Sequence, residues 1–257
     1  MKKSRFDKIG IKQVIRLEWM DRCLSLLLSG MSASEIRIDL TDYLADKKQS
    51  GGTGERGDKT YTIAIGILAA WFDPAPELID LRDRLLILAK QSSNDNWLPL
   101  HWALMIAAYP FWYNVAIQSG RVLALQERVT QKQIFDRLVE RYGERTTVLR
   151  NARYAVRSFV AWGVLEDTET KGRYKKSDPM AISDPNLIAV LFEAMLISTP
   201  EHKAPLRSLI ASPALFPMCL AMDVAQQAIA SNPRLISDHF GDGEMMVSWD
   251  RVTKIMM

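Results

Sequence analysis

The chain has 257 residues, of which 48% are hydrophobic and 25% charged, a composition typical of a soluble globular protein rather than a disordered one. No segment approaches the ~18 uninterrupted apolar residues of a membrane span, and the basic N-terminus lacks the apolar run of a signal peptide, so we expect a cytoplasmic protein. The two cysteines lie far apart in apolar stretches, which indicates thiols buried in a reducing compartment and excludes a disulfide framework.

The net charge of +3 is unevenly distributed along the chain. Residues 128–176 contain 12 Lys and Arg against 6 Asp and Glu, whereas the remainder contains 21 against 24. A local excess of positive charge is the electrostatic signature of a nucleic-acid-binding surface. The distribution therefore indicates that the middle of the chain is the candidate binding region.

Helical periodicity begins near the N-terminus. Apolar residues at helical spacing predict a helix over residues 11–29, and Gly30 can end it in the left-handed conformation. Ser32 and Glu35 then form a capping box, which predicts the start of a second helix.

Further helical stretches complete the N-terminal part. One is expected at about 59–72, another starts at Asp73 and runs to about residue 90, and an aromatic-rich pair is broken around Pro110. Together these elements predict an N-terminal helical bundle that covers residues 1–126.

The stretch SGGTGERGDKT, residues 50–60, resembles a phosphate-binding loop. Gly52 and Gly57 have the spacing of the motif GxxxxGK[ST], but Asp58 separates the second glycine from Lys59. Such a loop binds phosphate when it joins a buried strand to a helix N-terminus, and here a helix precedes it. We therefore interpret the stretch as a linker between helices and predict no nucleotide site.

The chain changes in character after the bundle. Thr130 and Gln133 form a second capping box at the start of a helix that Gly143 ends, and another helix follows up to Gly163. Two short extended runs around a Lys-Gly turn come next. The order helix, turn, helix, β-hairpin is that of a winged-helix domain, which we place at residues 127–197.

The remainder of the chain, residues 198–257, is expected to be a C-terminal helical extension. Asp184 and Pro185 begin the last helix of the preceding domain, a further helical pair covers roughly 204–230, and the tail has weak periodicity. No internal repeat is visible in the sequence. The predicted fold class is therefore mainly α: a helical bundle, a winged-helix domain and a helical extension.

One predicted helix of the winged-helix domain carries a stripe of arginines. Arg150, Arg153 and Arg157 follow the spacing i, i+3, i+7, whereas apolar residues such as Val156 and Phe159 form the opposite face. An arginine fork binds phosphate or guanine through two parallel hydrogen bonds. This is the arrangement that a helix in a DNA major groove requires.

The predicted nucleic-acid contacts combine this stripe with its neighbours on the helix and with four cations of the hairpin. The complete set is Arg145, Arg150, Asn151, Arg153, Tyr154, Arg157, Lys171, Arg173, Lys175 and Lys176. Contacts of this kind with several phosphates make binding steeply dependent on salt. In the alternative interpretation, the arginines form a solvated helix face and pair with carboxylates such as Glu144 or Asp136.

No catalytic, cofactor or metal site is predicted. The three histidines are scattered, and His101, between Leu100 and Trp102, is interpreted as a core residue. His239 lies in SDHFGDGE, which lacks the regular ligand alternation of a calcium loop. We therefore expect a non-enzymatic protein with no small-molecule substrate.

Three segments carry a resemblance to a known family: LEWMDRCLSLLLSGMSASEIRIDL near the start, ERTTVLRNARYAVRSFVAWGVLED before the hairpin, and SDPNLIAVLF after it. In order and local sequence they resemble BrxA, a family of small non-catalytic components of BREX phage-defence operons. The resemblance covers about residues 14–197. It implies an N-terminal helical bundle, a winged-helix domain, and binding of double-stranded DNA within a multi-protein defence system.

Three functions remain open from the sequence. The first is a non-catalytic accessory protein of a phage-defence system that binds duplex DNA mainly through phosphates, with other proteins of the defence complex as partners. The second is a scaffold whose winged helix docks another protein. The third is a dimeric transcriptional repressor. None of the three requires a membrane.

Overall fold

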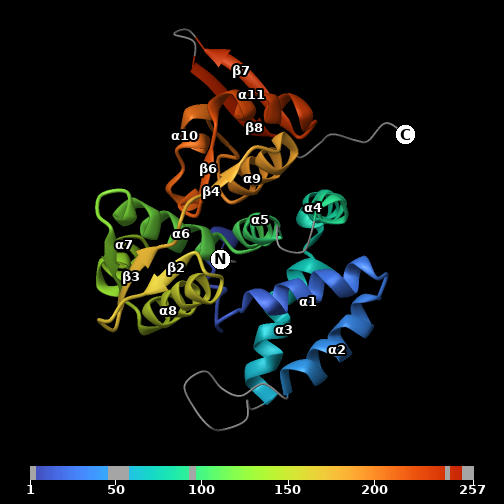
Figure 1. Cartoon of the computed structure of the whole chain (residues 1–257), viewed down its shortest axis with the longest axis vertical. Helices are drawn as coiled ribbons and strands as arrows, with labels where there is room; N and C mark the ends of the chain where they lie inside the picture. The colour runs from blue at the N-terminus through green and yellow to red at the C-terminus, as the bar shows by residue number, and fades with distance from the viewer. Residues whose placement is uncertain (1–3, 46–57, 93–96, 241–243, 251–257) are drawn as a thin grey trace.

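The computed structural model describes residues 4–45, 58–92, 97–240 and 244–250 (Figure 1). Within these residues the chain is mostly helical, and its short strands form three small sheets. The expected mainly-α class is therefore confirmed. Most of the glycine-rich stretch, residues 46–57, lies outside the described residues, so its interpretation as a linker stays a prediction.

Four helices form the N-terminal part: α1 (Leu17–Leu28), α2 (Ala33–Ala45), α3 (Asp58–Phe72) and α4 (Ile79–Gln91). The predicted capping box at the start of α2 is present. The Ser32 amide donates to Glu35 Oε2 at 2.8 Å, and the Glu35 amide donates to Ser32 Oγ at 3.3 Å. Hydrogen bonds between close neighbours in the chain thus determine where α2 begins.

Helix α4 begins later than the sequence predicts. Between Asp73 and α4 the chain forms a short 3₁₀ turn, Pro76–Leu78. Ala75 has extended backbone angles, with φ −59° and ψ 147°, because a following proline disfavours the α region. The second proline of this segment therefore delays the start of the helix.

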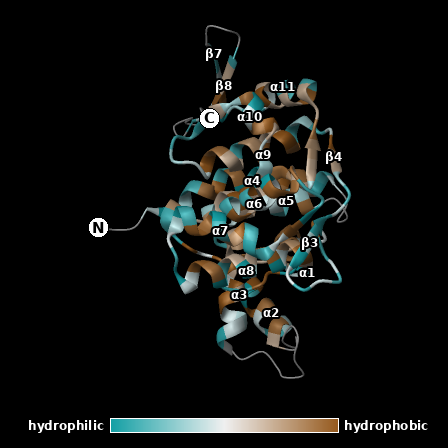
Figure 2. Cartoon of the chain, turned by 90° about the vertical axis from the view of Figure 1, so that its left-hand side faces the viewer, coloured by the Kyte–Doolittle hydropathy of each residue, from teal (hydrophilic) through white to brown (hydrophobic). Residues whose placement is uncertain are grey.

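Helices α5 (Leu98–Ala108) and α6 (Pro110–Leu123) lie at the centre of the molecule (Figure 1). Nearly all of α5 is buried, and α5 contacts α4, α6 and the later helix α9 (Pro185–Ile197). A helix that is surrounded on all sides is apolar all round, which explains its continuous hydrophobic sequence. Figure 2 shows hydrophobic residues along these inner helices.

The next unit follows α6 directly. Its elements are β1 (Arg128–Thr130), α7 (Gln131–Tyr142), α8 (Thr146–Ala161), β2 (Leu165–Asp167) and β3 (Arg173–Lys176). The strands form an antiparallel sheet in the order β1-β3-β2. The predicted Thr130–Gln133 capping box begins α7, and Gly143 and Gly163 follow the two helices with φ of 77° and 71°. The sequence does not predict β1, because so short a strand is recognisable only through its pairing with β3.

The C-terminal part contains more strand than the sequence predicts. After β4 (Met180–Ile182) and α9 come β5 (Lys203–Pro205), α10 (Leu206–Ile210), β6 (Met218–Leu220), α11 (Met222–Ser231), β7 (Leu235–Phe240) and β8 (Glu244–Trp249). Strands β5, β8 and β7 form an antiparallel sheet in that order, and β4 pairs in parallel with β6. The expected helical extension at residues 198–257 is corrected accordingly: it has helices, but also a sheet. Strand formation depends on such distant pairing more than on local sequence.

Helix α9 begins at the predicted aspartate cap. Asp184 Oδ1 accepts a hydrogen bond from the Asn186 amide at 2.9 Å, and Pro185 is the first helical residue. Among the described residues no single helix has both the length and the apolar character to cross a membrane; only the pair Lys59–Phe72 and Pro76–Gln91, bent by 51°, meets these criteria together.

Candidate nucleic-acid interface

Helix α8 is held in the molecule by the apolar face that the sequence predicts. Its fully buried apolar side chains are Val148, Ala152, Ala155, Val156 and Phe159. The Phe159 ring packs on Trp102 and Trp112, with centroid distances of 5.1 and 4.7 Å. These contacts fix α8 on α5 and α6, so that the opposite side of α8 faces outward.

The N-terminal segment also holds α8. The Ile15 amide donates to Ser158 Oγ at 2.9 Å, and the Trp162 indole donates to the Ile15 carbonyl at 3.1 Å. Asn151 is only 3% exposed, and its side-chain amide donates to the Ile9 carbonyl at 3.3 Å. The expectation that Asn151 flanks the arginine stripe on the surface is therefore wrong, because the N-terminal segment covers this residue.

The predicted cations of α8 differ in how available they are. Arg150 and Arg153 are exposed, and neither forms an ion pair with another described residue. Arg145 is also exposed, but its guanidinium donates to the Tyr142 carbonyl at 2.6 Å, at the end of α7. Tyr154 is half-buried and packs against the core. Arg150 and Arg153 are thus the cations of α8 that are most accessible to a ligand.

Arg157, the third arginine of the stripe, has a partner within the chain. Its Nη1 lies 2.6 and 2.8 Å from the two carboxylate oxygens of Asp167 on β2. This hydrogen bond is the main reason that the pKa of Arg157 is raised above its usual value, although partial burial opposes the shift. Arg157 therefore links α8 to the hairpin; it is a paired arginine, as in the alternative interpretation, but its partner is Asp167 rather than Glu144 or Asp136.

The four predicted cations of the β2–β3 hairpin are all exposed: Lys171, Arg173, Lys175 and Lys176. Lys175 Nζ lies 2.7 Å from Glu166 Oε2 on β2, and this hydrogen bond raises the pKa of Lys175. The Gly172 carbonyl accepts a hydrogen bond from the Gln131 amide at 2.8 Å, which ties the hairpin to the start of α7. The hairpin is thus anchored, and one of its four cations is neutralised.

A cleft of about 860 Å³ lies between α8 and the hairpin. Arg153, Arg157 and Lys171 line it together with the acidic residues Asp167 and Glu169. Because Asp167 is already paired with Arg157, the remaining charge at the cleft is positive. The fold therefore brings together side chains from the predicted helix and the predicted hairpin.

No protein-family model, no curated protein and no solved structure matches this chain.

Two residues at this face were missed by the sequence interpretation. Arg128 is exposed on β1, where it lies opposite Lys175 of β3, and Asp167 restrains Arg157. Arg128 does fall within the basic region of the sequence, but its place on the face depends on the unpredicted strand β1. Nothing in the sequence pattern assigns Asp167 to Arg157.

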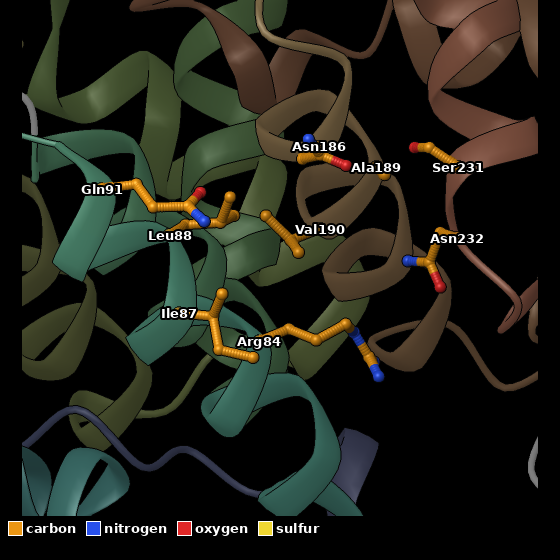
Figure 3. Close-up of a pocket in the computed structure, with 9 residues that line it drawn as sticks. All are labelled: Arg84, Ile87, Leu88, Gln91, Asn186, Ala189, Val190, Ser231 and Asn232. Atoms are coloured by element: carbon orange, nitrogen blue, oxygen red, sulfur yellow. The ribbon is translucent and has the colours of Figure 1, made fainter. Parts of the chain in front are cut away.

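A second hollow, of about 240 Å³, lies between α4, α9 and α11 (Figure 3). Arg84 and Asn232 line it, but both also bind the buried carboxylate of Glu193, Arg84 through Nη2 and Asn232 through Nδ2 at 3.0 Å. The Trp249 indole donates to the same carboxylate at 3.2 Å. Since these groups bind one another, we interpret the network as a link between α4 and the C-terminal part.

No group of three His, Cys, Asp or Glu side chains within the described ranges could hold a metal ion. His101 is fully buried, as predicted: Nδ1 accepts from the Trp71 indole at 3.1 Å, Nε2 lies 2.9 Å from Asp21 Oδ1, and burial lowers the pKa of His101. Cys23 is buried, whereas Cys219 is exposed, contrary to expectation, because alternate residues of β6 point outward.

Proposed function

We propose that this protein is a non-catalytic accessory protein that binds duplex DNA, with α8 and the β2–β3 hairpin as a winged helix. The order of β1, α7, α8, β2 and β3 and the sheet order β1-β3-β2 support this proposal. We propose that α8 enters the major groove of the DNA and that the hairpin lies against the adjacent sugar–phosphate backbone.

The observation that carries the proposal is that several cations on this face are exposed and form no ion pair with another described residue. Arg150 and Arg153 project from a helix whose other side is fully buried, and Lys171 and Arg173 lie exposed on the adjoining hairpin. Because the backbone of α8 and of the hairpin is already held in place, binding phosphate orders only the side chains, and each cation offers charge-assisted hydrogen bonds. A polyanion is the ligand that such a surface favours.

We propose that most of these contacts are to phosphates. Arg157 is already bound by Asp167 and Asn151 is buried, so two of the predicted groups that could approach base edges are withdrawn. Phosphate contacts give a log–log salt dependence of roughly −0.9 per phosphate neutralised. The protein then binds duplexes of different sequence with similar affinity.

The decisive experiment is a salt titration of binding to a random duplex. Arg150→Ala/Arg153→Ala should lose most of the duplex affinity, and the salt dependence should weaken by about 0.9 for each phosphate contact removed. The matched control, Arg37→Ala/Lys90→Ala, removes the same charge from α2 and α4 and should bind like the parent. Equal affinity and equal slope for the parent and the α8 variant would contradict the proposal.

We also propose that the protein acts with partner proteins of a phage-defence complex, because three of its segments resemble BrxA. A specific observation favours the second candidate function, a winged-helix scaffold: Asp167 and Glu166 neutralise Arg157 and Lys175 on the same face. In that case the protein should bind no random duplex even at low salt, and the same titration separates the two functions.

A further inference from the structure

The C-terminal part repeats the strand arrangement of the first unit. In the sheet β1-β3-β2, Tyr174 of the middle strand pairs with Val129 on one side and Asp167 on the other. In the sheet β5-β8-β7, Val247 of the middle strand pairs with Ala204 and Ser237. All neighbouring pairs follow in the same register, so each residue of β1, β2 and β3 has one counterpart in β5, β7 and β8.

The helices have the same places in both units. A long buried helix comes first, α6 in one unit and α9 in the other. Helix α7 begins directly after β1, and α10 begins directly after β5. Three residues separate the end of α8 at Ala161 from the start of β2 at Leu165, and three separate the end of α11 at Ser231 from the start of β7 at Leu235. The second unit differs in the short helix α10 and in strand β6, which precedes α11.

Alignment of α8 and α11 by their last residues also matches four buried positions near their C-terminal ends, whereas the counterparts of buried Ala152 and Val156 are exposed. In the first unit the four matching positions are Ala155, Ser158, Phe159 and Trp162, and their counterparts are Ala225, Ala228, Ile229 and Asn232. All eight side chains are buried. Order, register, connection length and four inward positions thus agree, and together they define α9–β8 as a second copy of the frame formed by α6–β3.

The outward positions do not agree. The same alignment places Asp223 at the position of Arg153 and Gln227 at that of Arg157, and both are exposed. In the sheets, Met246 replaces Arg173 and Ser248 replaces Lys175. These four cations of the first unit are therefore absent from the equivalent positions of the second.

The few cations of the second unit are also engaged. From Leu206 to Asp250 the chain contains only two Lys or Arg residues. Arg207 pairs with Glu244 at 2.6 Å, and Arg234 is buried and pairs with Asp80 of α4. Two positions keep a cation in both units: exposed Lys203 is the counterpart of Arg128, and Arg207, at the start of α10, is the counterpart of Lys132 in α7.

We infer that the two copies of the frame have different roles, and that nucleic acid is held by the α6–β3 unit alone. The inference rests on the proposed function. A surface with Asp223 and Asp238 exposed and its arginines paired repels phosphate, so one chain holds one duplex and does not bridge two. The second unit remains a latent binding frame that lacks the charged groups.

The test introduces positively charged side chains into the second unit. Asp223→Arg/Gln227→Arg introduces arginines at the positions equivalent to Arg153 and Arg157. Asp42→Arg/Ser25→Arg changes the net charge by the same amount on the exposed surface of α1 and α2 and serves as the control. Two duplexes, one with a donor and one with an acceptor fluorophore, are mixed with each protein, and energy transfer between them reports bridging. Native mass spectrometry counts the duplexes bound.

The parent and the charge-matched control should bind one duplex per chain without energy transfer. The restored variant should bind two duplexes and produce transfer, with a steeper salt dependence of about 0.9 for each phosphate newly neutralised. Bridging by the parent would overturn the inference, and so would a restored variant that behaves like its control. If the parent binds no duplex, the proposed function fails by itself; duplex binding gained only by Asp223→Arg/Gln227→Arg would still support the shared frame.

Discussion

The units α6–β3 and α9–β8 have the same sheet order and register but opposite surface character. Four buried helix positions agree between them; Phe159 and Ile229, for example, are both apolar and inward. Exposed positions diverge, with Arg153 in one unit and Asp223 in the other. The comparison teaches that the frame depends on what is buried, whereas the ligand depends on a few outward side chains that can change without affecting the frame.

The largest expected effect concerns the shared inward position of the two helices. Phe159→Ala should destabilise the protein by roughly 3–5 kcal/mol, because the ring packs on Trp102, Trp112 and Phe216 and leaves a cavity. Ile229→Ala should cost about 2–5 kcal/mol. Urea unfolding of both variants measures this. A loss below ~1 kcal/mol in either variant would mean that this side chain is not part of the core, and the two helices would then not be equivalent.

The first helices of the two units, α6 and α9, differ in the residue that lies four positions before the end of each helix. Glu193 of α9 is buried and binds Arg84, Asn232 and Trp249, whereas Ser119 of α6 donates only to a carbonyl of its own helix. Glu193→Gln should cost roughly 3–5 kcal/mol, because it leaves the Arg84 charge without its partner. Ser119→Ala should cost about 1 kcal/mol. Unfolding curves that give equal losses would show that the link to α4 contributes little.

The pH dependence of stability tests the burial of His101, which lies on a helix that contacts both units. His101 lies on α5, which contacts both α6 and α9, and burial lowers its pKa in the folded state. The unfolded chain therefore binds the proton more readily, and stability should fall as the pH drops below about 6.5, by at most ~1.4 kcal/mol per pH unit. His101→Gln should remove this component. Urea midpoints at pH 7.5 and 5.5 that shift equally in the parent and the variant would assign the effect to other groups.

The smallest expected effect concerns Asp167 and its counterpart Ser237. Asp167→Asn should release Arg157, cost at most ~1 kcal/mol of stability because the pair is largely exposed, and steepen the salt dependence of duplex binding by about 0.9. Ser237→Asn, the same new residue in the second unit, should change neither quantity. Weaker duplex binding by Asp167→Asn would mean that the ion pair positions the hairpin for contact rather than restraining Arg157.

Features that depend on neighbours within one or two helical turns could be predicted from the sequence alone. The capping boxes at Ser32 and Thr130 are present as predicted, and so is the apolar face of α8. Each of these relies on hydrogen bonds or side-chain spacing over a few residues, which the sequence displays directly.

Only the tertiary structure decided which of the predicted contact residues are free. Asn151 is covered by the N-terminal segment, and Arg157 is bound by Asp167 of β2. The C-terminal sheet and the repeated frame likewise depend on pairs such as Ala204 with Val247, far apart along the chain. Periodicity fixes which side of an element is apolar, but which distant segment covers that side is settled when the whole chain packs, because burial and pairing depend on all the elements at once.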